Sequence, residues 1–278
     1  GVPIMKKKTW KIIVRHLVLA LLAVIWLIPI VWLVVTSLST TKGVSYQHFF
    51  PEHWTLANYH QLFFKTDTAA NFPAWFKNTF IVAFFTCIIS SAFVLMVSYA
   101  FSCMRFKARK SLMSFSIILG MFPGVLSMIA VYFVLKMIGL TDSLAGLVIV
   151  YSAGSGLGFL VLKGFFDTIP YSLDESAMID GASRWQNFRY ITLPFLVPTM
   201  TVNMVLNLKA GITTFDYAFA LTGGGPNRAT EFIGLMIYND GFKDSNFAVA
   251  NAKAVVLALI IAILSFIQIR QSQKHEIN

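Results

Sequence analysis

Between residues 170 and 194 the chain reads PYSLDESAMIDGASRWQNFRYITLP, and this polar stretch separates two long apolar runs. Its spacing predicts two short helices joined by a tight turn. Ser172 and Glu175 have the spacing of a capping box at the start of the first helix. Ser183 and Gln186 repeat that spacing at the start of the second. A polar helical hairpin between apolar runs is expected to lie outside a bilayer.

The turn of this hairpin is predicted at Gly181, because glycine readily takes the left-handed conformation that ends a helix. Small residues surround it at Ser176, Ala177 and Ala182. They leave a surface that another protein can approach closely. Pro194 lies near the start of the next apolar run.

The composition of the whole chain indicates a membrane protein. Of 278 residues, 57% are hydrophobic and 12% are charged, and the mean hydropathy is +0.71. Soluble domains carry about 25% charged residues, so this chain has too little charge to cover a water-facing surface. Six apolar segments are long enough to cross a bilayer, which takes about 20 residues. They run from about Leu17 to Leu38, Thr79 to Cys103, Leu112 to Met137, Leu144 to Phe166, Phe195 to Leu221 and Val249 to Ile269.

Helix-breaking residues occur inside the first and the third of these spans. Pro29 lies in the first span, and Pro123 with Gly124 interrupts the third. Such breaks predict kinks, with hinges or cavity walls as the alternative. Two longer connecting segments, at 39–78 and 222–247, are expected on the outer side of the membrane.

The distribution of Lys and Arg predicts the orientation. The side that carries the start of the chain and the polar hairpin has 14 of these residues, and the opposite side has six. The positive-inside rule therefore places both termini in the cytoplasm. The net charge of +10 follows this loop pattern, which argues against nucleic-acid binding. The predicted organisation is a cytoplasmic segment at 1–16, a six-helix domain at 17–269 and a cytoplasmic tail at 270–278.

The hairpin resembles the cytoplasmic EAA loop of binding-protein-dependent ABC importer permeases. That loop carries Glu-Ala-Ala, then Asp-Gly-Ala in sugar permeases, then Ile-x-Leu-Pro at fixed spacing. This chain matches in register, with Ser in place of the first Ala. The matching residues are Glu175-Ser176-Ala177, Asp180-Gly181-Ala182, Phe188, Ile191 and Leu193-Pro194. The resemblance implies an all-α integral membrane protein of the type I ABC importer permease fold, with six transmembrane helices and a cytoplasmic coupling-helix loop.

The resemblance covers nearly the whole chain and is to the MalG-like subunits of maltose and oligosaccharide importers. The similar residues are Thr36-Ser37-Leu38, Leu56-Ala57-Asn58-Tyr59, Asn78-Thr79, Ser98-Tyr99-Ala100-Phe101, Phe106-Lys107 and Lys163-Gly164-Phe165-Phe166. A shorter part is more similar to the MalF-like partner subunits. It comprises Phe215-Asp216-Tyr217, the Thr-Gly-Gly-Gly-Pro run at 222–226 and Thr230-Glu231.

The resemblance also implies a role for the hairpin. In that family the loop forms coupling helices, which dock into a cleft on the ATPase subunits and transmit ATP-driven closure to the spans. This role is implied for Glu175, Ala177, Asp180, Gly181 and Ala182, and the acidic side chains suit charge-assisted contacts with basic groups. The alternative is an interfacial helix that only caps the bundle. The implied partners are a MalF-like second permease subunit, an ABC ATPase dimer, an extracytoplasmic sugar-binding protein and the lipid bilayer.

The sequence shows no nucleotide-binding, metal-binding or catalytic motif. The chain lacks Gly-x4-Gly-Lys-Ser/Thr, so ATP and Mg²⁺ are expected to bind to the partner ATPase and not to this chain. The five histidines have no acidic partners at metal-ligand spacing, and no catalytic triad pattern occurs. Neither a metal site nor enzymatic activity is predicted. Cys87 and Cys103 are 16 residues apart in one apolar run, or ~24 Å along a helix, which excludes a disulfide between them.

Polar residues in the last two spans are the candidates for a solute path. A charge inside a bilayer marks a pathway or a buried pair by default, which applies to Lys209, Asp216 and Lys253. Asn203, Asn207 and Lys209 are spaced to fall on roughly one side of the fifth span, although Asn207 and Lys209, two residues apart, are not aligned. The predicted path residues are therefore Asn203, Asn207, Lys209 and Asp216. Hydrogen bonds between helices are the alternative role for the Asn residues.

These features predict a multi-pass permease subunit of the cell membrane. It would form half of the translocation path of an ATP-driven importer for a maltodextrin-like or other oligosaccharide. One alternative is a permease for another binding-protein-delivered solute, such as glycerol phosphate. A second is an ion-driven secondary transporter, which predicts acidic relays or inverted repeats within the membrane. Only Asp216 approaches such a relay, and no repeat is visible.

Overall fold

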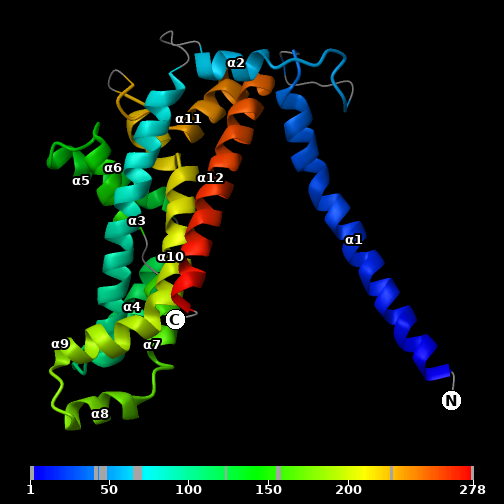
Figure 1. Cartoon of the computed structure of the whole chain (residues 1–278). Helices are drawn as coiled ribbons and strands as arrows, with labels where there is room; N and C mark the ends of the chain where they lie inside the picture. Colours follow the sequence, from blue (N-terminus) through cyan, green and yellow to red (C-terminus); the bar gives the residue numbers. More distant parts are fainter. Residues whose placement is uncertain are drawn as a thin grey trace. The chain divides into compact units, whose positions relative to one another are not determined.

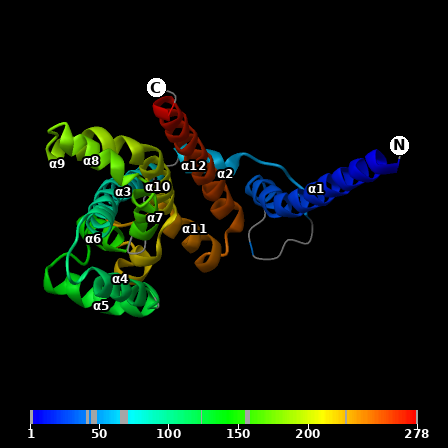
Figure 2. The ribbon, with the colours of Figure 1, turned by 90° about the horizontal axis from the view of Figure 1, so that it is seen from below.

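The computed structural model describes residues 3–40, 43, 49–64, 71–122, 124–154, 158–225 and 228–276 (Figures 1 and 2). Regular structure in these ranges is helical, apart from one isolated bridge between Ser39 and Trp54. The chain divides into two compact units. The first comprises Gly1–Ala70 and Ile237–Val256, and the second comprises Asn71–Met236 and Leu257–Asn278.

Four of the predicted spans are long apolar helices. They are α1 (Pro3–Ser37), α3 (Phe72–Cys103), the stretch Arg184–Thr222 around α10 (Leu193–Thr213), and α12 (Phe247–Glu276). Each is long enough for a bilayer, and they coincide with the first, second, fifth and sixth predicted spans. Pro29 lies inside α1 without ending it.

The fourth predicted span is a bent pair of helices. α6 (Leu144–Ala153) and α7 (Gly158–Phe166) meet at an angle of 51°. Neither helix is long enough to cross a bilayer alone, and together they have the length and composition of a broken span or of a re-entrant loop. Ser143 is the N-cap of α6, and its hydroxyl accepts a hydrogen bond from the Gly146 N–H at 3.0 Å.

The third predicted span is also divided. α4 (Arg109–Gly120) is followed by α5 (Gly124–Met137), so the interruption falls where helix-breaking residues predict it. Pro123 itself lies outside the described residues. Each of these helices is shorter than the bilayer core requires, and the apolar part of α5 is confined to Leu126–Met137.

The first unit is held together around the end of α1. The Ser37 hydroxyl lies 2.6 Å from the Tyr59 hydroxyl of α2 (Ala57–Phe64), and the Asn58 amide donates to the carbonyl oxygens of Ser37 and Ser39, each at 2.9 Å. These bonds occupy carbonyl groups that the end of α1 leaves without helical partners.

An ion pair links α12 to the π-helical turn η3 (Asn239–Lys243) in the first unit. Lys253 of α12 is buried and pairs with the Asp240 carboxylate. Of the two alternatives that the sequence allows for this lysine, the structure therefore gives the buried pair. Burial raises the pKa of Asp240 in spite of the opposing charge of Lys253.

α3 is the central helix of the second unit. It packs against α10, α6 and α7, and Figure 1 shows α3 and α10 running side by side. The core near the Cys103 end of α3 is built from apolar side chains of α3, α7 and α10. They are Val94, Phe101, Phe159, Leu162, Phe166 and Leu196.

The crossing of α3 and α10 depends on small residues. Gly211 of α10 faces Ala83 of α3, and a Cβ atom on Gly211 would lie 2.9 Å from the Ala83 Cα and 3.1 Å from its Cβ. Two backbones that approach so closely gain packing contacts that lipid cannot replace. The Cys87 thiol donates to the Met204 carbonyl oxygen at 3.3 Å across the same interface.

Replacing Gly211 by alanine is expected to destabilise the chain. The new methyl group meets backbone, which cannot turn aside, so the helices must separate at a cost of about 1–3 kcal/mol. Over most of this range the cost exceeds the gain in helix propensity, which is about 1 kcal/mol. The unfolding midpoint in detergent should fall for G211A. It should not fall for the control G164A, whose Cβ would meet nothing within 4 Å. Equal midpoints for G211A and the wild type would contradict the close crossing.

Candidate functional site

The polar hairpin folds as two short helices at the end of the second unit where α3 ends and α10 begins (Figure 1). α8 spans Tyr171–Ile179 and α9 spans Arg184–Asn187. The π-helical turn η1 (Phe188–Thr192) then leads without a break into α10. α9, η1 and α10 therefore form one continuous helical stretch.

The start of α8 differs from the sequence prediction. The helix begins at Tyr171, and Pro170 is its N-cap, without a side-chain hydrogen bond. Ser172 therefore lies inside the first turn, and the predicted capping box between Ser172 and Glu175 is wrong. The physical reason is that Pro170, with φ of −64°, already has the conformation that enters a helix, so the helix starts earlier than the serine.

The end of α8 confirms the predicted turn at Gly181. This residue has a φ of +85°, in the left-handed region. The Gly181 N–H donates to the Met178 carbonyl oxygen at 3.1 Å, and the Ala182 N–H donates to the Ala177 carbonyl oxygen at 2.9 Å. These two bonds form a Schellman motif, which fixes the direction of the chain after the helix.

The start of α9 confirms the second predicted capping box. The Ser183 hydroxyl accepts from the Gln186 N–H at 3.3 Å, and the Ser183 N–H donates to the Gln186 side chain at 2.8 Å. One hydrogen bond joins the two helices: the buried Asn187 amide donates to the Asp174 carboxylate at 2.9 Å. The sequence analysis did not predict this bond. The hairpin is thus closed at its turn and across its two arms.

The predicted coupling residues differ in exposure. Glu175, Asp180 and Gly181 are exposed, Ala182 is half-buried, and Ala177 is buried. The carboxylates are therefore free to meet another protein, while Ala177 packs inward. A hollow of about 340 Å³ borders the turn. It is lined by Asp180, Gly181, Ala182, Gln186, Asn187, Tyr190 and Ile191.

Apolar side chains share the exposed surface of the hairpin. Ile179 is 85% exposed, and Met178, Trp185 and Tyr190 are more than half exposed. A surface that combines large exposed apolar groups with carboxylates is typical of a protein contact. We call the surface formed by Glu175, Met178, Ile179, Asp180 and Trp185 the coupling surface.

The predicted path residues on α10 do not form one cluster. Asn203 and Asn207 are half-buried and one turn apart, and Lys209 is exposed. The Asn207 amide lies 3.5 Å from the Ser91 hydroxyl oxygen of α3. For Asn207 this contact favours the alternative of a hydrogen bond between helices.

Asp216 lies just beyond a break in the same stretch. α10 ends at Thr213, and Thr214 has extended backbone. The Asp216 carboxylate accepts from the Thr214 hydroxyl at 2.6 Å and from the Tyr151 hydroxyl of α6 at 3.0 Å. The ring of Tyr217 packs edge-on against that of Tyr151, with centroids 5.2 Å apart. Tyr151 was not predicted, because nothing in its local sequence distinguishes it from other aromatic residues of an apolar helix.

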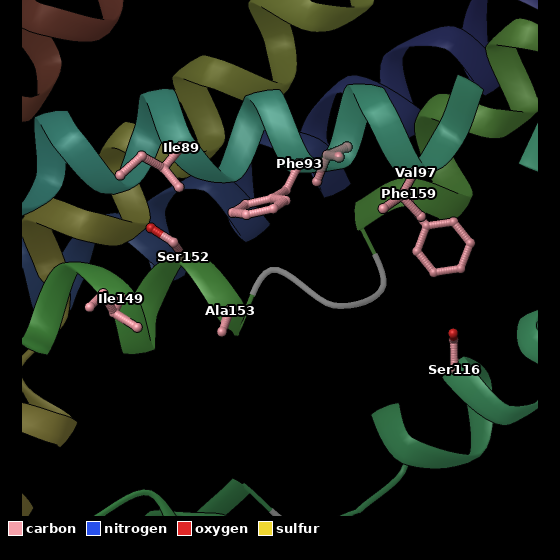
Figure 3. A pocket seen from close by; sticks show the side chains of 9 residues that line it. Ile89, Phe93, Val97, Ser116, Ile149, Ser152, Ala153 and Phe159 are labelled. Carbon is pink, nitrogen blue, oxygen red and sulfur yellow. The ribbon is translucent and has the colours of Figure 1, made fainter. Parts of the chain in front are cut away.

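A cavity of about 570 Å³ lies between α3, α4, α6 and α7 (Figure 3). Among the described residues, its lining is apolar apart from two hydroxyl groups and includes no charged residue. The lining residues are Ile89, Phe93, Val94, Val97, Ser116, Ile149, Ser152, Ala153 and Phe159. Such a lining offers few partners to the many hydroxyl groups of a sugar, so this cavity is a weaker candidate than the surroundings of Asp216.

Comparison with known sequences identifies relatives among transport proteins. The family described as "Binding-protein-dependent transport system inner membrane component" matches residues 100–273. The chain is 37% identical over 158 residues to the multiple sugar-binding transport system permease protein MsmF of Streptococcus mutans, covering 56% of this chain and 54% of that protein. This chain thus spans about half the length of MsmF.

Other relatives align with this chain over most of its length. The chain is 31% identical over 280 residues to the maltose/maltodextrin transport system permease protein MalG of Escherichia coli, covering 93% of this chain and 92% of that protein. A chain in the crystal structure of a bacterial ABC transporter involved in the import of the acidic polysaccharide alginate shares the fold. Its TM-score is 0.72 at 21% identity, over 96% of this chain and 99% of that chain. This protein is therefore a multi-pass, membrane-embedded member of the family of binding-protein-dependent transport system inner membrane components.

Proposed function

We propose that this chain is the permease subunit of an ATP-driven sugar importer, and that the coupling surface docks on a separate ATPase. The observation that carries the proposal is the hairpin itself. It is fixed by a Schellman motif and a capping box, it exposes carboxylates beside apolar groups, and it continues through η1 into α10. A rigid exposed element that is continuous with a span suits the transmission of a mechanical stroke.

The chemistry of the coupling surface supports a basic, partly apolar cleft on the ATPase. Glu175 and Asp180 would pair with Arg or Lys side chains, because charge-assisted bonds are stronger than neutral ones. Ile179 would fill an apolar pocket. ATP and Mg²⁺ would be bound by the ATPase, and this chain would catalyse no reaction. The hairpin and both termini, at 1–16 and 270–278, would then lie in the cytoplasm, with the permease domain at 17–269.

The names of the relatives support sugar as the substrate class. MsmF is named for multiple sugars and MalG for maltose and maltodextrin. This chain would accept a maltodextrin-like or other oligosaccharide from an extracytoplasmic binding protein. A MalF-like second permease subunit would supply the other half of the path. Glycerol phosphate remains the alternative solute.

Asp216 is the path residue that the geometry supports best. Extended backbone inside a span is tolerated where it lines a polar cavity or is buried in protein, and Asp216 lies two residues after such a break. A carboxylate and two tyrosine rings offer the hydrogen-bond acceptor and the apolar faces that sugars require. Asn203 and Lys209 would contribute to the path from different faces of α10, and Asn207 would hold α10 against α3.

Removal of the Glu175 carboxylate is expected to weaken ATPase docking. The loss of one charge-assisted bond corresponds to about 10- to 100-fold lower affinity. The tagged chain should co-purify with an ATPase and a second permease, and E175A should retain less ATPase. Maltotriose-loaded binding protein should stimulate hydrolysis by the wild-type complex. S172A, an exposed change on the same helix, is the control.

Two outcomes would contradict the proposal. Stimulation by glycerol 3-phosphate but not by maltotriose would overturn the sugar assignment. Ion-driven flux without ATP would overturn the assignment as an ATP-driven importer.

Substitution of Gly181 should impair coupling most when the new residue tolerates a left-handed backbone poorly. Valine at a φ of +85° is strained, by about 1–2 kcal/mol or more, whereas asparagine tolerates this region. G181V is expected to lose amide exchange protection at residues 177–182 and to hydrolyse ATP without transport. G181N should lie close to the wild type. Equal behaviour of the two variants would show that the turn is unimportant for coupling.

Neutralising Asp216 should slow sugar uptake without affecting assembly. D216N keeps the size of the side chain but removes the charge to which Tyr151 and Thr214 donate. Uptake of labelled maltotriose in proteoliposomes should fall by about 10-fold, the value of one charge-assisted hydrogen bond. D142N, a change in the loop before α6, is the matched control. Unchanged uptake by D216N would remove this residue from the path.

A further inference from the structure

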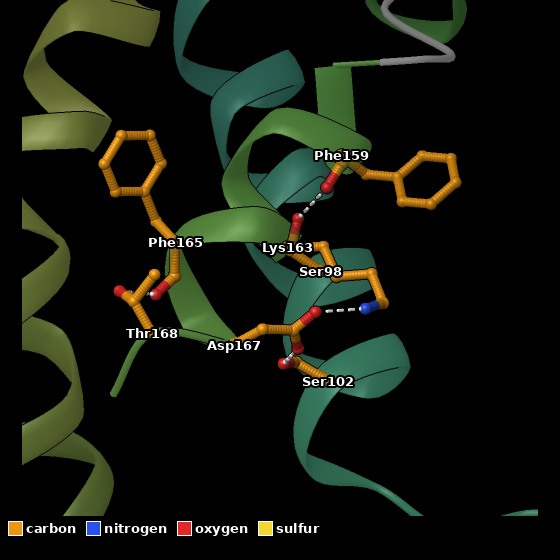
Figure 4. Close-up of polar contacts among 7 residues, drawn as sticks. All are labelled: Ser98, Ser102, Phe159, Lys163, Phe165, Asp167 and Thr168. Carbon is orange, nitrogen blue, oxygen red and sulfur yellow. Dashed lines mark hydrogen bonds and ion pairs between the residues drawn. The ribbon is translucent and has the colours of Figure 1, made fainter. Parts of the chain in front are cut away.

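A carboxylate at the junction of α7 and α8 joins two helices. Asp167 follows α7 directly and precedes Pro170, where the hairpin begins. One of its oxygens accepts a hydrogen bond from the hydroxyl of Ser102, in the last turn of α3. The other pairs with the ammonium group of Lys163 at 2.5 Å (Figure 4). Both oxygens are therefore engaged, and only one of the two bonds is local.

The same faces of α3 and α7 are joined one turn further along. The Ser98 hydroxyl donates to the Phe159 carbonyl oxygen at 3.0 Å, and the rings of Phe101 and Phe159 are stacked with centroids 5.3 Å apart. Ser98 and Ser102 are four residues apart, so they lie on one face of α3. α7 is thus attached to α3 at both of its ends.

The other end of the hairpin reaches α3 as well. Tyr99 of α3 packs edge-on against Phe166, the last residue of α7, and against Phe188, the first residue of η1. Phe188 in turn stacks on Trp185 of α9, with centroids 5.7 Å apart. The Cys103 end of α3 therefore contacts the segments before and after the hairpin.

We infer that Asp167 is a positioning residue that makes α3 move together with the hairpin. The inference rests on the proposed coupling role of the hairpin. α10 follows the hairpin through the continuous chain, but α3 has no covalent link to it. Tyr99 and Ser98 hold α3 to the ends of η1 and α7, but Asp167 holds it to the segment between α7 and Pro170. Without the Asp167 bonds, a displacement of α8 would bend this segment and would reach α3 less completely. With them, both central helices of the second unit receive the displacement.

The charge of Asp167 is kept over the physiological range. Burial alone would raise its pKa, but the bonds from Lys163 and Ser102 and the positive charges of Lys163 and Arg109 outweigh this, so the pKa is lowered. A lowered pKa means that the bonds are fully present above the ordinary pKa of an aspartate. They are lost only as the pH falls through the lower value in the folded protein. The contact should therefore act as a permanent link.

The test is the number of ATP molecules hydrolysed per maltotriose imported by the complete importer in proteoliposomes. D167A should raise this ratio roughly 2- to 30-fold, as expected for loss of a coupling contact, while hydrolysis continues. D167N, which keeps the shape but loses the ion pair, should show a smaller increase. T168V is the matched control, because the Thr168 hydroxyl bonds only to the Phe165 carbonyl oxygen of its own turn in Figure 4.

A second variant separates positioning from folding. S102A removes the bond to α3 and leaves the pair between Lys163 and Asp167 intact, so it should uncouple without loss of assembly. Combined with D167A it should add little, because both changes break the same link. An unchanged ratio in both D167A and S102A, or an equal fall of hydrolysis and import, would overturn the inference. If the wild type imports no maltotriose, the proposed substrate fails instead, and the ratio is measured with the solute whose binding protein stimulates hydrolysis.

Discussion

The close approach of α3 and α10 at Ala83 and Gly211 is the contact on which the second unit depends. In lipid, apolar side chains gain nothing by leaving their solvent, so helices associate through tight packing and a few polar bonds. Gly211 allows the two backbones to meet, and Cys87 and Asn207 add polar contacts along the same interface. α6 and α7 then pack on α3, and the hairpin is carried by the start of α10.

The hairpin combines stiffness with exposure. Its turn is fixed by backbone bonds at Gly181, the start of α9 by the Ser183 capping box, and its arms by the bond between Asn187 and Asp174. None of these bonds uses Glu175 or Asp180, which leaves both carboxylates available to another protein. The internal bonds hold the shape, and the outward side chains present the binding chemistry. A docking element needs both, because an ordered surface loses less entropy when it binds.

Two groups of polar bonds join helices at different places in the second unit. Ser98, Ser102 and Asp167 join α3 to α7 near the hairpin, while Tyr151, Thr214 and Asp216 join α6 to the end of α10. The first group suits the transmission of movement, since it joins α3 to the segment that leads into the hairpin. The second presents a carboxylate and aromatic rings at a break in a span, which suits a solute with many hydroxyl groups. Membership of a family of transport components is consistent with this division.

Much of the fold could be predicted from local sequence. Long apolar runs determined α1, α3, α10 and α12, because only a helix satisfies its own backbone in lipid. Glycine and serine spacing determined the turn at Gly181 and the capping box at Ser183. The spacing of Lys163 and Asp167 also favours a local ion pair.

Only the tertiary structure decided which distant groups meet. It placed Ser102 on Asp167, Tyr151 on Asp216 and Asp240 on Lys253, over separations that no local pattern encodes. The start of α8 at Tyr171 is different, because there a local effect, the preset backbone of Pro170, prevailed over the predicted serine cap. The physical reason is that a helix is determined by its solvent and by backbone hydrogen bonds between residues four apart. The partner of a polar side chain depends instead on how several helices pack at once.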